Sequence, residues 1–158
     1  MTGPQPQGWA PAGEGGQVRM RLRELRAGGR TFVWRAEIFH VSGEGDCHRC
    51  IRVRVWGAGK NSQVLQADLL SKSWGTPWSA CATDGAYPRA RDVRAVVDYA
   101  LTHGWEPDHV GGKFLLTEKK HAGMFELADF LLTDRLWDSG SPDPTARVVH
   151  AFEQHPSG

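Results

Sequence analysis

Residues 89–107 read RARDVRAVVDYALTHGWEP, and residues 112–117 continue as GKFLLT. The apolar side chains of the first stretch are spaced i, i+3, i+4, i+7 and i+8, which places them on one face of a helix: Val93, Val96, Val97, Ala100 and Leu101. Gly104 supplies a residue suited to the end of a helix, and Pro107 prevents its continuation. We therefore expect a helix that ends near His103 and is followed by a strand.

The length and composition limit the class of protein to which this segment belongs. The chain has 158 residues, of which 40% are hydrophobic, and a formal net charge of +1. Such a chain is long enough for one domain with a core. A charge so close to zero argues against a general polyanion binder. Three cysteines suggest reduced thiols in a cytoplasmic protein, and no apolar run is long enough to cross a membrane.

Upstream of the helix, three stretches alternate between apolar and polar residues with the period of a strand: Gln17–Leu25, Thr31–Val41 and Ile51–Val55. The pair Gly28-Gly29 supplies a turn between the first two, so we expect an antiparallel meander. Residues 63–72 fit neither helix nor strand cleanly, and we favour a strand. Residues 113–118 form the strand after the helix.

The C-terminal part is less regular. Residues 125–136 are compatible with helix or strand, and we favour a strand that forms a hairpin. Asp143 followed by Pro144 is a helix start. The predicted fold is therefore α+β, an antiparallel sheet of five to six strands with one main helix packed on one face. Residues 1–16 are a flexible lead, 17–137 a single domain, and 138–158 a linker, a short helix and a disordered tail.

The preferred site is the segment between residues 71 and 88, which shows no periodicity and contains turn signals. Loops of this length in compact domains are usually functional or disordered. Tryptophan is enriched at the energetic centres of interfaces, although tryptophans also pack in cores. The candidate contact residues for a protein partner are Trp74, Trp78, Asp84, Tyr87 and Trp105.

Arginines on the predicted meander give an alternative partner. They occupy the polar positions of the alternation, where they would form a basic sheet face able to follow phosphates, with Trp56 as a stacking platform for a base. The competing interpretation is a solvated face, partly neutralised by acidic neighbours or covered by the C-terminal helix. The residues of this face are Arg19, Arg21, Arg23, Arg35, Arg52 and Arg54.

Cys47 and Cys50 have the CxxC spacing that lets two thiolates bind one zinc ion. Two further ligands are required, and the available residues are His40, His48 and Cys81. Without a second paired motif, the sequence favours incidental thiols in a hairpin, so no metal or other cofactor is predicted.

Asp108, preceded by Pro107, and the run Glu118-Lys119-Lys120 resemble the short pattern of the PD-(D/E)xK nucleases. That family holds Mg²⁺ between carboxylates on adjacent strands, whereas Asp108 falls in the predicted turn after the helix. A metal-dependent nuclease is therefore a remote alternative, and we assign no catalytic residue.

A longer resemblance covers about half of the chain. Its residues are Tyr87-Pro88, Asp92 to Val97, Gly104-Trp105-Glu106-Pro107, Gly112, and Phe114 to Leu116, with Lys60-Asn61-Ser62 and Thr133-Asp134 in addition. In these the chain resembles a group of small bacterial proteins, of actinobacterial type, for which no activity is established. Members of that group often have Thr-Pro where this chain has Arg89-Ala90. The resemblance implies a bacterial cytoplasmic domain and no site residues.

No catalytic motif emerges from these patterns, so the sequence favours a binding protein over an enzyme. We expect a soluble, non-enzymatic binding or accessory protein, such as one that neutralises a protein partner. Nucleic-acid binding through the arginine face is the alternative, and no membrane partner is expected.

Overall fold

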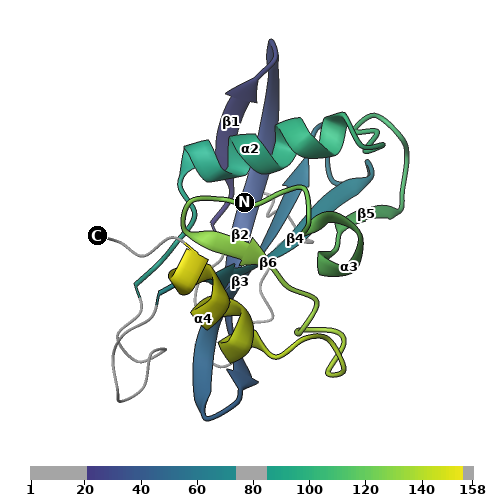
Figure 1. The fold of residues 1–158 in the computed structure, drawn as a ribbon. Coiled ribbons are helices and arrows are strands. Elements are labelled where there is room, and N and C mark those ends of the chain that lie inside the picture. The colour runs from purple at the N-terminus through teal and green to yellow at the C-terminus, as the bar shows by residue number, and fades with distance from the viewer. Residues whose placement is uncertain (1–20, 74–84, 155–158) are drawn as a thin grey trace, which may run out of the picture.

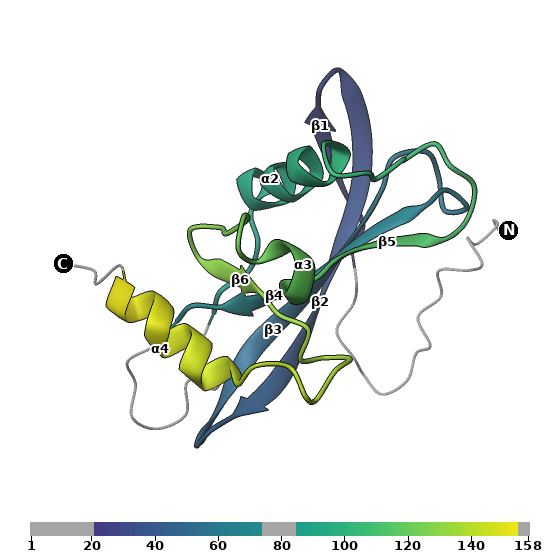
Figure 2. The same ribbon diagram turned by 45° about the vertical axis from the view of Figure 1, so that its right-hand side comes forward.

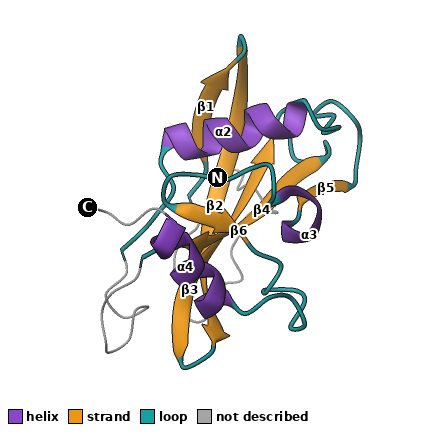
Figure 3. Cartoon of the chain, in the orientation of Figure 1, coloured by secondary structure: helices purple, strands orange, loops and turns teal. Residues whose placement is uncertain are grey.

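The computed structural model describes residues 21–73 and 85–154. No helix within these ranges has the length and apolar character needed to cross a membrane. The elements follow the chain as β1 (Arg23–Ala27), β2 (Arg30–Gly43), β3 (Asp46–Trp56), β4 (Val64–Ser71), α2 (Ala90–Leu101), β5 (Lys113–Leu116), α3 (Glu118–His121), β6 (Phe130–Leu132) and α4 (Pro144–Gln154). Figure 1 shows the long β2–β3 pair running through the molecule, and Figure 3 separates helices from strands by colour.

The first four strands form the expected antiparallel meander. Gly28 and Gly29 make the turn between β1 and β2, and both have positive φ angles, 60° and 79°, as a tight hairpin turn requires. β3 begins earlier than predicted, because the polar residues after Val41 continue the ladder up to a two-residue turn at Glu44-Gly45. The segment 63–72 is a strand, as expected.

The outer edge of β4 differs from the prediction of a wholly antiparallel sheet. β5 pairs with the first half of β4 in parallel, and β6 pairs with its second half in the antiparallel direction. The parallel pair follows from α2, which is the crossover that two parallel strands need. β6 is much shorter than the predicted strand 125–136. The expectation of an α+β fold with a sheet of five to six strands is confirmed. Among the described residues the sheet has six strands and is mostly antiparallel.

The first strand has the opposite face orientation to the one predicted. Its turn fixes the register so that Leu25 lies opposite Phe32, and both are buried. Arg23 therefore shares the core-facing side of β1, with its guanidinium carbon 5.8 Å from the centre of the Trp34 ring. Leu22, which the alternation placed inward, is exposed. The part of the predicted strand before residue 21 lies outside the described residues.

The larger core lies between α2 and one face of the strands. Val93, Val96, Val97 and Ala100 are fully buried, as their spacing predicts. Leu101, the last residue of the pattern, is exposed instead. The sheet contributes residues from β1 to β6 to the same cluster, among them Phe32, Ile51, Val53, Leu65, Leu69 and Leu132.

A second, smaller core forms under α4. It consists of Val41, Cys50, Leu70, Leu131 and Val148. Neighbouring residues of a strand point to opposite faces, so this core lies on the other face of these strands from the α2 core. Figure 2 shows α4 beside the end of the β2–β3 pair, away from α2. The prediction of one main helix is therefore incomplete, because a second helix docks on the sheet.

A buried ionic cluster joins α3, β6 and α4. The Asp134 carboxylate accepts the N–H groups of Glu118 (2.8 Å) and Lys119 (3.3 Å) at the start of α3. In return, Glu118 accepts the N–H of Asp134 at 3.0 Å and pairs with the Arg147 guanidinium at 3.3 Å. Burial raises the pKa of the Glu118 carboxyl, while the Asp134 N–H and Arg147 oppose that rise. This cluster fixes α4 to the loop after β6.

The packing of α4 gives a testable prediction. A Cβ atom added to Gly43 would lie 2.3 Å from Thr145 Oγ1 and 2.6 Å from the Thr145 backbone nitrogen. Because α4 or the end of β2 must move, Gly43→Ala should lower the free energy of unfolding by about 1–3 kcal/mol, the usual cost of overpacking. Urea denaturation followed by fluorescence measures this change.

Gly123→Ala is the matched control, since a Cβ at Gly123 meets nothing within 4 Å. A Gly43→Ala protein that is as stable as the Gly123→Ala protein would show that α4 does not pack on β2 as described.

Candidate functional site

A groove of about 670 Å³ opens where β4 ends and α2 begins. Three segments line it: Ser71–Ser73 after β4, Gly85–Arg89 before α2, and Asp129–Phe130 at the start of β6. The N–H of Lys72 donates to the Asp129 carbonyl at 3.0 Å, which holds the first and third segments together. The groove is thus formed where the ladder between β4 and β6 ends.

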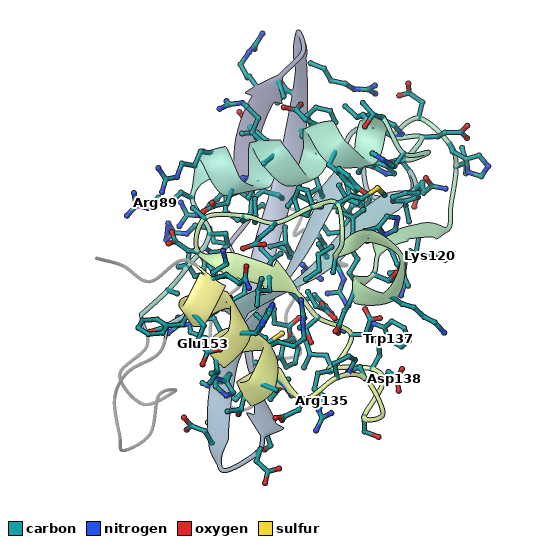
Figure 4. The ribbon with its side chains drawn as sticks, in the orientation of Figure 1. Arg89, Lys120, Arg135, Trp137, Asp138 and Glu153 are labelled. Atoms are coloured by element: carbon teal, nitrogen blue, oxygen red, sulfur yellow. The ribbon has the colours of Figure 1, made fainter. Side chains whose placement is uncertain are left out.

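The side of the groove nearest α2 is fixed by the start of that helix. The Asp92 carboxylate, which is buried, accepts the N–H of Arg89 at 2.7 Å. The N–H of Asp92 in turn donates to the Arg89 carbonyl at 2.9 Å. These reciprocal bonds set the direction in which the chain enters α2. Figure 4 shows the Arg89 side chain projecting from the start of α2.

The exposed side chains of the groove are aromatic and charged. Tyr87 is 37% exposed, and Arg89 is also exposed. The Lys72 ammonium group pairs with Glu126, and Asp129 lies 3.9 Å from the Arg91 guanidinium. The rest of the lining comes from Ser71, Ser73, Gly85, Ala86, Pro88 and Phe130. The arrangement offers an aromatic surface beside a positive group and several hydrogen-bonding groups.

The predicted contact residues have different positions. Trp74, Trp78 and Asp84 lie outside the described residues. Trp105 is only 2% exposed, and its indole N–H donates to the Gln63 carbonyl at 3.0 Å. Its ring lies 5.7 Å from that of Phe32, so Trp105 is a core residue and is not available to a partner. Of the described candidates, Tyr87 reaches the surface.

The arginine face is smaller than the sequence predicted. Arg19 lies outside the described residues, Arg21 is exposed before β1, and Arg23 points to the other face of the sheet. The arginines that share the predicted face are Arg35, Arg52 and Arg54.

Carboxylates and amides occupy much of this remaining face. Arg52 makes two hydrogen bonds to the buried carboxylate of Asp68, at 2.8 and 3.0 Å. Arg54 donates to the Gln66 amide oxygen at 3.1 Å and lies 3.5 Å from Glu37. Burial lowers the pKa of the Arg54 guanidinium, as do the nearby charges of other arginines. The face is therefore largely an internal network of ion pairs and hydrogen bonds. Asp68 and Gln66 of β4 supply most of its partners, where the competing interpretation expected a solvated face or a covering helix.

Two arginines of this face lie over aromatic rings. The guanidinium carbon of Arg35 lies 5.7 Å from the centre of the Trp56 ring, and that of Arg52 lies 5.6 Å from the Phe39 ring. Arg35 and Arg54 are direct partners on neighbouring strands. Like charges in that arrangement repel, and Glu37 lies 3.5 Å from Arg54 on the same face.

Cys47 and Cys50 cannot share a metal ion, because residues three apart in a strand point to opposite faces. Cys50 is a free thiol that is fully buried under α4, and burial raises its pKa far above the usual range. Cys47 takes part in a disulfide bond. The expectation of reduced thiols therefore holds for Cys50 and is wrong for Cys47.

The two acidic residues of the nuclease-like pattern belong to separate ion pairs. Asp108 pairs with Arg30, and the Arg30 hydrogen bond lowers the pKa of the Asp108 carboxyl. Glu118 belongs to the buried cluster with Arg147. Within residues 21–73 and 85–154, no group of three or more His, Cys, Asp or Glu side chains is arranged to hold a metal ion.

Sequence reasoning missed Asp129 and Phe130 of the groove. Ser71 and Lys72 belong to the preferred segment 71–88, but Asp129 and Phe130 join them through the pairing of β4 with β6, and no local pattern predicts a contact between residues so far apart. Arg89 was noted as an unusual start of the helix, which is the signal that could have drawn attention to it.

Comparison with protein-family models, with curated proteins and with solved structures finds no match for this chain. The arguments about function therefore rest on the geometry described above.

Proposed function

We propose that this protein is a non-enzymatic binding protein that holds a short segment of a partner protein in the groove between β4, β6 and α2. The observation that carries the proposal is the groove itself. Its volume of about 670 Å³ lies within the range of roughly 300–1,000 Å³ that is usual for ligand sites. Exposed Tyr87 and Arg89 border it, and both residue types are common at the energetic centres of interfaces.

The charges of the groove favour an acidic partner segment. Lys72 and Asp129 have counter-charges from Glu126 and Arg91 respectively. Arg89 adds a positive charge at the rim. A carboxylate of the partner would pair with Arg89, while an apolar or aromatic side chain would lie against the Tyr87 ring.

The positions of the perturbed acidic, thiol and imidazole groups also favour binding over catalysis. Catalytic groups commonly have shifted pKa values and lie together in a cleft. The described groups of this kind with shifted pKa values are Cys50, Asp108, Glu118 and His121, and none of them lines the groove.

Selection of peptides tests this proposal. A displayed library of random peptides, about a dozen residues long, is selected on the full chain, and the enriched peptides are synthesised. We expect peptides with an acidic residue near an apolar one. Tyr87→Ala and Arg89→Ala should each weaken their affinity by about tenfold, because loss of an interface anchor costs more than about 1 kcal/mol.

Trp137→Ala is the control, since Trp137 is an exposed aromatic residue that lies away from Arg89 in Figure 4 and does not line the groove. Selected peptides that bind the Tyr87→Ala and Arg89→Ala proteins as tightly as the parent would contradict the proposal. So would a selection that enriches no peptide.

A second candidate function is binding of single-stranded nucleic acid at the face that carries Arg35, Arg52 and Arg54. The positive charges that these residues place on one face of β2 and β3 favour it, because phosphates are attracted to such a face. A labelled thymidine strand of about 20 nucleotides should then bind with an affinity that falls steeply with salt. The double variant Arg35→Gln, Arg54→Gln should abolish binding, whereas Arg91→Gln should retain it. No binding at about 50 mM salt would exclude this function.

A further inference from the structure

The sheet face that carries the arginines continues under α4. Alternate residues of a strand point to the same face, so Cys50, Arg52 and Arg54 lie on one face of β3. Cys50 belongs to the small core under α4, whereas Arg52 and Arg54 bond to side chains of β4. α4 therefore covers one end of a face whose other end carries the arginines.

Few apolar side chains hold α4 on this face. Val148 is completely buried in the small core, and Ala151 is partly buried against it. The last residues of the helix are exposed, including Phe152 at 45%. α2, by contrast, has four apolar residues that are completely buried. Because burial of apolar surface is the main source of stability, α4 is held more weakly than α2.

Polar contacts at the first turns of α4 supply further attachment. Thr145 Oγ1 lies 2.7 Å from His48 Nε2, and the Arg147 guanidinium lies 3.3 Å from the Glu118 carboxylate. When the helix leaves, water reaches these groups and replaces the lost partners. Hydrogen bonds that exchange with water in this way make only a modest net contribution to stability.

α4 can leave without breaking the sheet. The ladders of the six described strands are all formed by residues before it, since β6 ends at Leu132. Asp134 stays bonded to the Glu118 N–H at the start of α3, so the hinge lies after Asp134. Figure 2 shows α4 at the end of the β2–β3 pair, separate from α2.

We propose that α4 is a reversible cover, which undocks as a unit while α2 and the sheet stay folded. Undocking exposes the apolar residues beneath the helix, namely Val41, Cys50, Leu70 and Leu131. The docked helix hides this surface, and the undocked helix adds it to the face that carries the arginines. The position of α4 thus sets how much apolar surface this face presents.

The thiol of Cys50 reports the opening of this cover. Cys50 is free, completely buried and part of the core that α4 closes. An alkylating reagent such as iodoacetamide reacts with it only in molecules whose cover is open, and leaves the disulfide of Cys47 unchanged. The labelling rate in the folded chain, divided by the rate in the unfolded chain, therefore gives the opening constant.

Labelling of the full chain tests the proposal, with peptide mapping by mass spectrometry to assign the modified residue. We expect an opening constant at least about tenfold above the equilibrium constant for global unfolding, which urea denaturation measures. Val148→Ala should raise the opening constant by about a further tenfold, because it removes a buried contact between the cover and the sheet. Amides within α4 should exchange with the same opening constant.

Val96→Ala is the matched control. Val96 is also a completely buried valine on a helix, but it lies in the core under α2. Its truncation should lower the free energy of global unfolding and leave the labelling of Cys50 unchanged, because α2 stays folded when the cover opens.

Three results would overturn the proposal. The first is labelling of Cys50 only at the rate set by global unfolding. The second is a Val148→Ala protein that is labelled no faster than the Val96→Ala protein. The third is exchange of the α4 amides that is slower than the labelling, because the reagent would then reach Cys50 by another route. None of them bears on the groove, which other segments line.

Discussion

The structure depends on β4, which is buried on both faces and hydrogen-bonded along both edges. Seven of its eight residues, Leu65–Ser71, are buried. One face supplies Leu65, Ala67 and Leu69 to the core under α2, while Leu70 reaches the core under α4. A strand in this position must satisfy every backbone group through its neighbours, because water does not reach it. That requirement explains why β3, β5 and β6 all pair with it.

The candidate site follows from the same constraint. The ladder on the outer edge of β4 ends at Ser71, and the Lys72 N–H makes one further bond to Asp129. The next described residue after Ser73 is Gly85, and α2 begins at Ala90. The groove lies in the space between these two points. Ser71 and Phe130 of its lining belong to paired strands, whereas its exposed groups, Tyr87 and Arg89, come from the segment that leads into α2.

Local sequence patterns predicted much of this fold. The prediction of α2 is correct because its buried residues repeat with the helical period. The prediction of β2 is correct because its alternation of apolar and polar residues is long. The direction of β5 was not available from any local pattern, since parallel and antiparallel strands of four residues look alike. β6 is only three residues long, which is too short for an alternation to locate.

The site was harder to predict than the fold. Trp105 could have been a contact residue or a core residue on sequence alone, because tryptophan is favoured in both places. Arg23 was assigned to the wrong face, since the turn at Gly28-Gly29, and not the alternation upstream, sets the register of β1. Arg52 and Arg54 pair with Asp68 and Gln66 of β4. The sequence does not show that β4 lies beside β3, so it could not predict these partners.

Native-state hydrogen exchange in increasing denaturant tests the central role of β4 most directly. If β4 organises the fold, the amides of Leu65–Leu70 exchange only when the whole domain unfolds. Their opening free energy should then equal the free energy of global unfolding, while amides of β1 exchange through smaller openings. Exchange of the β4 amides through local openings, at a lower free energy than those of β1, would contradict this account.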